Sequence, residues 1–265
     1  HYKPLYQKAA IVAAGPIVNF IFAILVFIGL FTSLGEPYTT SQVSGVQDGG
    51  AAFEAGIEAG DHVIRLNGNP IDRFDDLQRV IGINMGEPVL FSILRNGEEI
   101  EFSIIPTLQK SRDAFGNEFD VRRIGIQSGP IEIAKLNIYD ALVRSVQKTG
   151  ELVNLMLVTT GQVITGARPV DEMGGPIKIA QYSGQQASLG IISFISFMAL
   201  ISINLGLVNL FPIPMLDGGH LLFYGIEAIK GSPVSKRVQE IAYMAGFLMV
   251  ISLMVFLTWN DLSSF

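Results

Sequence analysis

The sequence contains no cysteine, one tryptophan and three histidines. The absence of cysteine excludes disulfide bonds, cysteine-ligated zinc, iron–sulfur clusters and thiol nucleophiles. The histidines stand far apart in the chain, at His1, His62 and His220. A histidine-rich metal centre built from this chain alone is therefore excluded.

Charged residues are also scarce. They make up 16% of the 265 residues, against about 25% in ordinary soluble domains. Hydrophobic residues make up 49%, which argues against both a disordered chain and an ordinary water-soluble protein. The 18 Lys and Arg are outnumbered by 24 Asp and Glu, and no long basic block is present. We therefore expect no nucleic acid partner.

Three long uncharged stretches separate the charged residues. A helix of roughly 20 apolar residues crosses the hydrocarbon core of a membrane, and each stretch is at least that long. We predict membrane spans near Ala9–Leu34, Leu189–Phe211 and Ile241–Trp259. A more polar stretch predicts an amphipathic helix at Ile138–Ile164, lying on the membrane or against the helix bundle. The lipid bilayer is therefore an expected partner.

The basic residues near the span ends predict the orientation of the chain. Lys3 and Lys8 precede the first span, and three more basic residues lie between the second and third, at Lys230, Lys236 and Arg237. We expect both flanks to face the cytoplasm. The Glu36–Lys135 segment, with nine Lys and Arg against 16 Asp and Glu, is then expected on the other side. An acidic extracytoplasmic domain fits this arrangement.

Between the first two spans, Tyr38–Leu108 has the pattern of a small β-rich domain. Strand-like residues at Val43–Val46 and Val63–Leu66 are bounded by turn residues, and Phe74–Ile81 has helical spacing of its apolar residues. The Arg95–Glu98 segment has Asn-Gly at its centre and predicts a hairpin turn between two apolar strands.

The sequence GIEAGD at Gly56–Asp61, followed by LNG at Leu66–Gly68, resembles PDZ domains of the bacterial protease type. This resemblance implies a groove that takes an extended peptide as an added strand, with backbone amides holding its C-terminal carboxylate. It also implies a carboxylate-binding loop after the last strand, with the candidate Ile124, Gly125 and Ile126. The alternative interpretation of Ile124–Ile126 is a simple β-turn that binds no carboxylate. His62 is expected to be a surface histidine.

The second predicted span ends in the sequence NLFPIPMLDGGH at Asn209–His220. Its two prolines break the helix, and the freed backbone groups are tolerated at membrane depth only against protein or a water-filled cavity. Asp217 lies on the resulting irregular turn. A carboxylate at membrane depth is expected either to pair with another polar group or to have a functional role. The residues alone leave two interpretations open: a zinc ligand, or the N-cap of a helix that starts at Gly218.

The same segment resembles the LDG motif of the site-2 proteases, the intramembrane zinc metalloproteases, of the regulator of sigma-E type. The resemblance continues in GGPIKIA at Gly174–Ala180 and in AIVAAGPIVNF at Ala10–Phe20, which is similar to the second transmembrane helix of that family. It implies a membrane α-helical fold of about three transmembrane helices with an inserted PDZ domain. It also implies Zn²⁺ as the cofactor, with Asp217 as one ligand.

Further roles follow from the same resemblance. Asn209 and Pro214 match positions that bind substrate beside the active site, although an interhelical hydrogen bond is an alternative role for Asn209. Three residues of the first span match a helix-packing motif next to the catalytic helix: Gly15, Pro16 and Asn19.

One departure from the family is large. Its His-Glu-x-x-His motif, which supplies two zinc-binding histidines and the general base, is absent from this sequence. We therefore expect a fragment that lacks the catalytic helix, contains no catalytic residue of its own and is inactive alone. His220, three residues after Asp217, could pair with it on a metal, but a hydrogen-bonded structural role is expected.

The resemblance implies a protease of the bacterial inner membrane, with its PDZ domain outside the cytoplasm. Its substrates would be single-pass membrane proteins such as anti-sigma factors, or remnant signal peptides, and peptide tails would bind at the PDZ groove. The alternatives are a non-catalytic, membrane-anchored PDZ protein and a transporter, which the few spans disfavour. We expect four parts: a first transmembrane segment (1–35), a PDZ-like domain (38–128), a linker with the amphipathic helix (129–188) and a C-terminal membrane domain (189–265).

Overall fold

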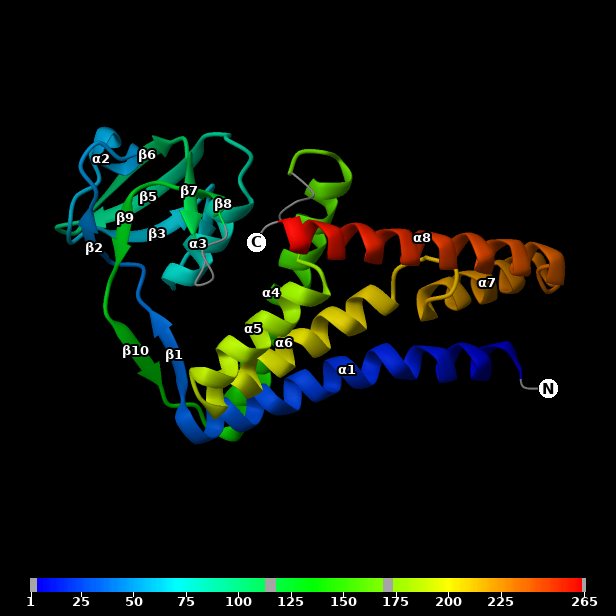
Figure 1. Ribbon diagram of the computed structural model, residues 1–265. Coiled ribbons are helices and arrows are strands. Elements are labelled where there is room, and N and C mark those ends of the chain that lie inside the picture. Colours follow the sequence, from blue (N-terminus) through cyan, green and yellow to red (C-terminus); the bar gives the residue numbers. More distant parts are fainter. Residues whose placement is uncertain (1–3, 113–117, 169–173, 264–265) are drawn as a thin grey trace. The chain divides into compact units, whose positions relative to one another are not determined.

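The computed structural model of the protein describes residues 4–112, 118–168 and 174–263. These residues form two compact units (Figure 1). The helical unit takes its described residues from 1–33, 137–157 and 169–265, and the β-rich unit comprises 34–136 and 158–168.

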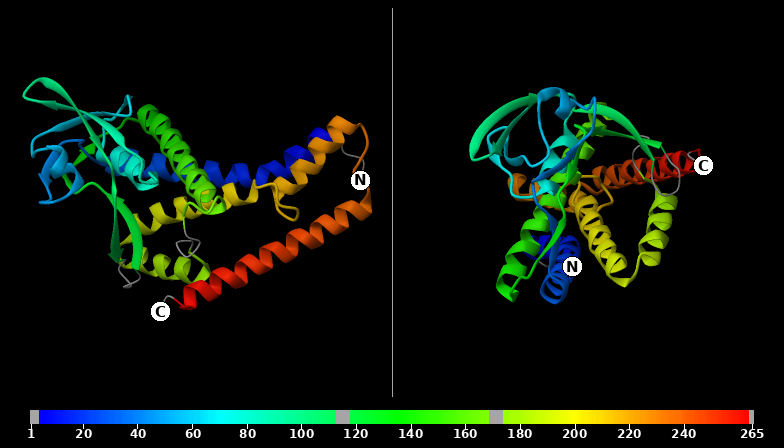
Figure 2. Two further views of the ribbon diagram at one scale, coloured as in Figure 1. Left: turned by 90° about the horizontal axis from the view of Figure 1, so that it is seen from above. Right: turned by 90° about the vertical axis from the view of Figure 1, so that its left-hand side faces the viewer.

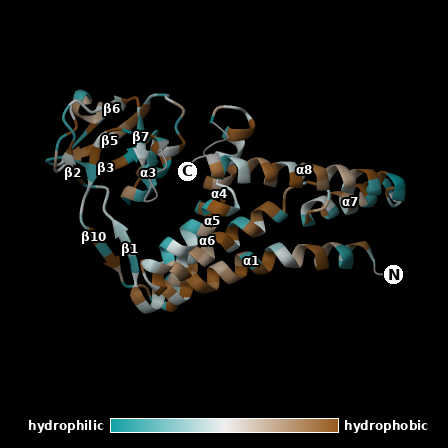
Figure 3. Ribbon diagram, in the orientation of Figure 1, coloured by the Kyte–Doolittle hydropathy of each residue, from teal (hydrophilic) through white to brown (hydrophobic). Residues whose placement is uncertain are grey.

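The helical unit is built from helices. They are α1 (Leu5–Leu34), α4 (Ile138–Ile164), α5 (Pro176–Ser188), α6 (Ile191–Asn209), α7 (Asp217–Lys230) and α8 (Lys236–Ser263). The last residues of α4, from 158 onward, belong to the β-rich unit. Among the described helices, α1, α6 and α8 are long and apolar enough to cross a membrane, and Figure 3 shows their apolar residues in brown. The prediction of three apolar helices that could span a membrane is thereby confirmed. α4 has the predicted bounds, and its association with a membrane stays a prediction.

The short helix α5 lies within the segment predicted as a linker. It forms a helical hairpin with α6, joined at Leu189 and Gly190 (Figure 2). The start of α5 is completed by Asp261 of α8. The buried carboxylate of Asp261 accepts hydrogen bonds from the backbone N–H groups of Gly175 (2.9 Å), Ile177 (3.0 Å) and Lys178 (3.1 Å). The first N–H groups of a helix have no partner within it, so a carboxylate from 83 to 86 residues away completes this helix end.

The β-rich unit is the predicted PDZ-like domain. Its main sheet has the strand order β4-β3-β5-β6, formed by β3 (His62–Leu66), β4 (Asn69–Pro70), β5 (Val89–Arg95) and β6 (Glu98–Ile104). Three strand pairs complete it: β1 (Glu36–Thr39) with β10 (Ile131–Ala134), β2 (Val43–Val46) with β9 (Ile126–Ser128), and β7 (Thr107–Arg112) with β8 (Glu118–Arg123). Two helices, α2 (Ala51–Ala55) and α3 (Phe74–Ile83), pack with the strands around a core that includes Val43, Val63, Leu66, Leu77, Phe91 and Ile93.

The hairpin between β5 and β6 turns at Asn96 and Gly97, whose φ angles of 51° and 87° fit a type I′ turn. Arg95, just before the turn, donates from Nε and Nη2 to the two carboxylate oxygens of Asp61, at 2.7 Å each. Burial alone raises the pKa of the Asp61 carboxyl, but the hydrogen bonds from Arg95 and from the Glu58 amide lower that pKa overall. The Gly-Asp of the PDZ-like motif is therefore an ion-pair site that fixes the hairpin.

Strands β1 and β10 form an antiparallel ribbon, visible in Figure 1, with Glu36 opposite Ala134 and Thr39 opposite Ile131. The Tyr38 hydroxyl donates to Glu132 Oε2 at 2.6 Å, which raises the pKa of the Tyr38 phenol. Since β1 follows α1 and β10 precedes α4, this ribbon carries the chain into and out of the 34–136 part of the β-rich unit.

The end of α4 contacts the end of α3 within the β-rich unit. Gln162 Nε2 donates to the Ile83 carbonyl at 2.5 Å, and Arg168 Nη2 donates to the Gly82 carbonyl at 2.7 Å. The last carbonyls of a helix lack partners within it, so two side chains satisfy the C-terminal end of α3.

Candidate functional site

The connection between α6 and α7 carries the candidate site residues. Asn209 is the last residue of α6, and the loop after it contains Pro212 and Pro214, which cannot continue a helix. Met215 has φ +96°, a conformation that is costly for a side chain other than glycine. A loop with such a backbone is held in place by its surroundings.

Two glycines let this loop fold back onto the start of α7. A Cβ at Gly218 would overlap the carbonyl oxygens of Leu210 and Phe211, and a Cβ at Gly219 would overlap the carbonyl oxygen of Ile213. Both glycines are buried. The Asp-Gly-Gly sequence therefore places a carboxylate at a helix start that is packed directly against backbone.

Asp217 is the first residue of α7, and the N-cap is Leu216, which makes no side-chain capping bond. The interpretation of Asp217 as an N-cap is therefore wrong. Its side chain is half-buried, and none of the hydrogen bonds or ion pairs found among the described residues involves its carboxylate. A half-buried carboxylate that no described residue binds is a candidate cation ligand, and this role of Asp217 stays a prediction.

The α1 residues of the predicted packing motif lie next to this site. An ideal Cβ at Gly15 would be 3.2 Å from Asp217 Oδ2, so the absence of a side chain at Gly15 makes room for the carboxylate. One turn further along, Asn19 packs against α6, where a Cβ at Gly206 would be 3.2 Å from Asn19 Cβ and 3.1 Å from the Pro16 carbonyl oxygen. Ser202 Oγ donates to the Asn19 carbonyl at 2.9 Å. These contacts bring α1 close to both α6 and α7.

The two residues predicted to bind substrate lie on the same connection. Asn209 is half-buried at the end of α6, and among the described residues its side-chain amide is found in no hydrogen bond. Pro214 is half-buried, and its carbonyl oxygen lies against Gly246 of α8. Their role in substrate binding stays a prediction.

In the part of the chain that the structure describes, the donor set around Asp217 falls short of what zinc requires. Zinc in an enzyme usually has three protein ligands, whereas the described residues hold no group of three or more His, Cys, Asp or Glu that could share a metal ion. His220 Nδ1 lies 3.0 Å from the Tyr243 hydroxyl of α8, as expected of a structural histidine. Asp217 is therefore a single candidate ligand, and the residues described here do not by themselves fit a zinc ion.

The remaining predicted positions lie in the β-rich unit. His62 is half-buried, with Nε2 3.2 Å from Ser41 Oγ, so it is less exposed than expected. Ile124 and Gly125 connect β8 to β9, and Ile126 begins β9. The carbonyls of Ile124 and Gly125 accept from the N–H groups of Ala52 (2.8 Å) and Gln47 (2.7 Å). This segment is therefore fixed within the domain, and its binding of a carboxylate stays a prediction.

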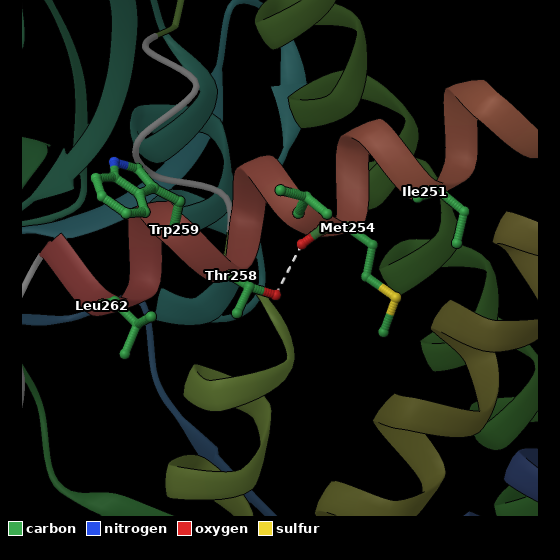
Figure 4. A pocket seen from close by; sticks show the side chains of 6 residues that line it. Ile251, Met254, Thr258, Trp259 and Leu262 are labelled. Atoms are coloured by element: carbon green, nitrogen blue, oxygen red, sulfur yellow. Dashed lines mark hydrogen bonds between the residues drawn. The ribbon is translucent and has the colours of Figure 1, made fainter.

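Sequence reasoning missed the contribution of α8 to the site. Gly246 of α8 contacts Pro214, and Tyr243 of α8 contacts His220. The sequence signal for these contacts was a small and a polar residue within a predicted apolar span. Further along α8 lies an apolar hollow of about 390 Å³ (Figure 4), lined by Ile251, Met254, Val255, Thr258, Trp259 and Leu262. The Thr258 hydroxyl in its lining donates to the Met254 carbonyl. The hollow contains no candidate site residue.

Comparison with known proteins places the chain in a family. Residues 1–253 match the family described as peptidase family M50. A protein of Agrobacterium fabrum, provisionally named a zinc metalloprotease, is 41% identical over 98% of this chain and 70% of its own length. The zinc metalloprotease RasP of Geobacillus kaustophilus is 36% identical over 99% of this chain and 60% of its own length.

Two further similarities are with a named protease and with a solved PDZ domain structure. The regulator of sigma-E protease RseP of Escherichia coli is 35% identical over 86% of this chain and 51% of its own length. The crystal structure of a PDZ domain of an SdrC-like protein from Listeria monocytogenes covers 34% of this chain and 88% of its own, at 22% identity and a TM-score of 0.28. With a family match over 253 of its 265 residues, the chain belongs to peptidase family M50, the site-2 proteases.

Proposed function

We propose that the protein is an intramembrane zinc metalloprotease in which this chain supplies Asp217 as a carboxylate ligand. The observation that carries the proposal is the half-buried Asp217 side chain, which no described residue binds and for which Gly15 of α1 leaves space. Membership of the family, the names of the relatives and the three apolar helices support it.

The other zinc ligands and the general base come, in this proposal, from a segment outside these 265 residues. The sequence contains no His-Glu-x-x-His, and the matched relatives are longer than the part that this chain covers. We therefore expect the 265-residue chain by itself to hold no zinc tightly and to cleave nothing.

Asn209 and Pro214 handle the substrate. A helical peptide bond has its N–H and C=O engaged within the helix, so a membrane-spanning substrate must unwind before cleavage. An amide side chain beside the Asp217 loop can donate to and accept from an extended backbone. The absence of a partner for the Asn209 amide among the described residues supports this role.

The substrates are single-pass membrane proteins such as anti-sigma factors, or remnant signal peptides. The PDZ-like unit binds or excludes their extracytoplasmic tails, with the loop at Ile124–Ile126 as the carboxylate-binding element. The protein lies in the bacterial inner membrane with this unit outside the cytoplasm. The distribution of Lys and Arg around the spans and the name of one relative, a regulator of sigma-E protease, support these assignments.

A second candidate is a non-catalytic, membrane-anchored PDZ protein. The lack of a complete set of metal ligands among the described residues favours it. Zinc analysis distinguishes the two functions: the protein expressed from its complete reading frame is expected to purify with about one zinc per chain and to cleave a single-span substrate. The 265-residue chain purified in parallel is expected to do neither. A complete protein without zinc and without cleavage would favour the PDZ function.

A further inference from the structure

One face of α8 contacts the chain on both sides of Asp217, at Pro214 in the preceding loop and at His220 in α7. Gly246 is buried in a helix whose residues are otherwise mostly exposed, and a Cβ there would overlap the carbonyl oxygen of Pro214. Tyr243 lies three residues earlier, on the same face of the helix. Its hydroxyl is 3.0 Å from His220 Nδ1, in the first turn of α7.

The Tyr243 ring packs on α7 as well. Its centroid is 5.2 Å from that of His220, and it meets the Phe223 ring edge-on at 5.7 Å. Tyr243 therefore contacts residues three and six positions after Asp217. A hydroxyl in an apolar span costs free energy unless it is paired, and this one is paired with the histidine that follows Asp217 by one turn.

The loop before Asp217 needs such support from outside. Met215 has a costly positive φ, Leu216 makes no capping bond, and no described residue holds the Asp217 carboxylate. The contacts of α8 with Pro214 on one side and with His220 on the other bracket this strained segment.

We propose that Tyr243 is a positioning residue for Asp217. It acts through His220, and Gly246 sets the distance between α8 and the loop. The functional value of this positioning rests on the proposed function, in which the Asp217 carboxylate must lie next to Gly15 to bind the metal. The arrangement itself is tested without metal or substrate.

The test uses disulfide formation in the chain, which has no native cysteine. The reporter pair is Gly15→Cys with Asp217→Cys, because the Cβ position of Gly15 lies 3.2 Å from Asp217 Oδ2. The control pair is Asn19→Cys with Gly206→Cys, whose Cβ positions are 3.2 Å apart at the contact of α1 with α6, close to the spacing in disulfides. The rate of cross-linking is measured in detergent for each pair.

Tyr243→Phe keeps the ring and removes the hydroxyl. We expect it to slow the reporter pair about fivefold, as loss of one hydrogen bond would, and to leave the control pair unchanged. Tyr139→Phe, at an exposed position of α4, is expected to change neither rate. An unchanged reporter rate in Tyr243→Phe would overturn the proposal. Slowing of both pairs would overturn it as well, because Tyr243 would then support the whole bundle.

Two further variants test the route of the effect. If Tyr243 acts through His220, the double variant Tyr243→Phe/His220→Gln slows the reporter pair no more than either single change; additive slowing contradicts the route. Gly246→Ala is expected to slow the reporter pair, whereas Gly225→Ala, where a Cβ would meet open space, is not. Since cross-linking requires neither zinc nor cleavage, a complete protein without zinc would refute the proposed function and leave these rates as they are.

Discussion

Gly15 of α1 faces the carboxylate of Asp217 of α7, with 3.2 Å between Asp217 Oδ2 and the position that a Cβ at Gly15 would take. The two residues are about 200 positions apart in the chain. A glycine in a membrane helix allows a neighbour to approach closely, and here the neighbour is the candidate metal ligand.

Gly15→Ala should therefore push the Asp217 carboxylate aside by a few tenths of an ångström. We expect cleavage by the complete protein to fall about tenfold, since small displacements of reacting groups cost large factors in rate. Gly29→Ala is the matched control on the same helix, because a Cβ there meets nothing within 4 Å. Equal cleavage rates for Gly15→Ala and Gly29→Ala would show that the contact does not matter for the reaction.

Asn209→Ala should leave the zinc content unchanged and slow cleavage by about five- to tenfold, the effect of one hydrogen bond to substrate. The measurements are metal analysis and cleavage of a single-span substrate by the complete protein. Asn204→Ala, five residues earlier on α6, is the control. Loss of zinc in Asn209→Ala would assign this residue to the metal site, and similar slowing in both variants would point to helix packing.

The orientation in the membrane can be tested by labelling single cysteines. We expect Asn96→Cys, in the β5–β6 turn, to react with an impermeant maleimide added to spheroplasts. Ser232→Cys, between α7 and α8, should react only after permeabilisation. The absence of native cysteine gives a clean background. Reaction of both positions from the same side would contradict the proposed orientation.

The Asp61–Arg95 pair should make the stability of the β-rich unit depend on pH. The pKa of Asp61 is lower in the folded protein than its ordinary value of 3.8, so the folded state favours the ionised carboxylate. The resulting stabilisation is present at neutral pH, begins to be lost as the pH falls below about 4, and disappears as it passes the folded pKa.

Denaturant unfolding of the chain between pH 7 and pH 2 measures this effect. Asp61→Asn should lower the free energy of unfolding at pH 7 by about 2 kcal/mol, because it weakens charge-assisted hydrogen bonds. Its acid-induced loss should also be smaller than that of the parent. Asp48→Asn, at an exposed position, should behave like the parent. A parallel pH dependence in Asp61→Asn and the parent would rule out the pair as the cause.

Local sequence patterns predicted a large part of the fold. The Asn96-Gly97 turn chemistry predicted the β5–β6 hairpin, the apolar spacing predicted α3 at Phe74 and beyond, and the long uncharged stretches predicted α1, α6 and α8. These elements depend on interactions between residues close in sequence, where turn preference and periodicity act directly.

Elements that depend on distant partners were not predicted. The β1–β10 ribbon joins strands of four residues, and the Tyr38–Glu132 bond within it spans 94 positions. The start of α5 depends on Asp261, 86 residues from Gly175. In the candidate site, the LDG resemblance identified Asp217, but no local pattern indicates that Tyr243 contacts His220 or that Gly246 contacts Pro214.

The most direct test of the central claim is the zinc content of Asp217→Asn in the complete protein. Asparagine nearly preserves the shape of aspartate, but a neutral amide is a poor zinc ligand compared with a carboxylate. We predict that zinc falls from about one per chain to well below that, together with cleavage. Full zinc content and full cleavage in Asp217→Asn would contradict the assignment of Asp217 as a ligand.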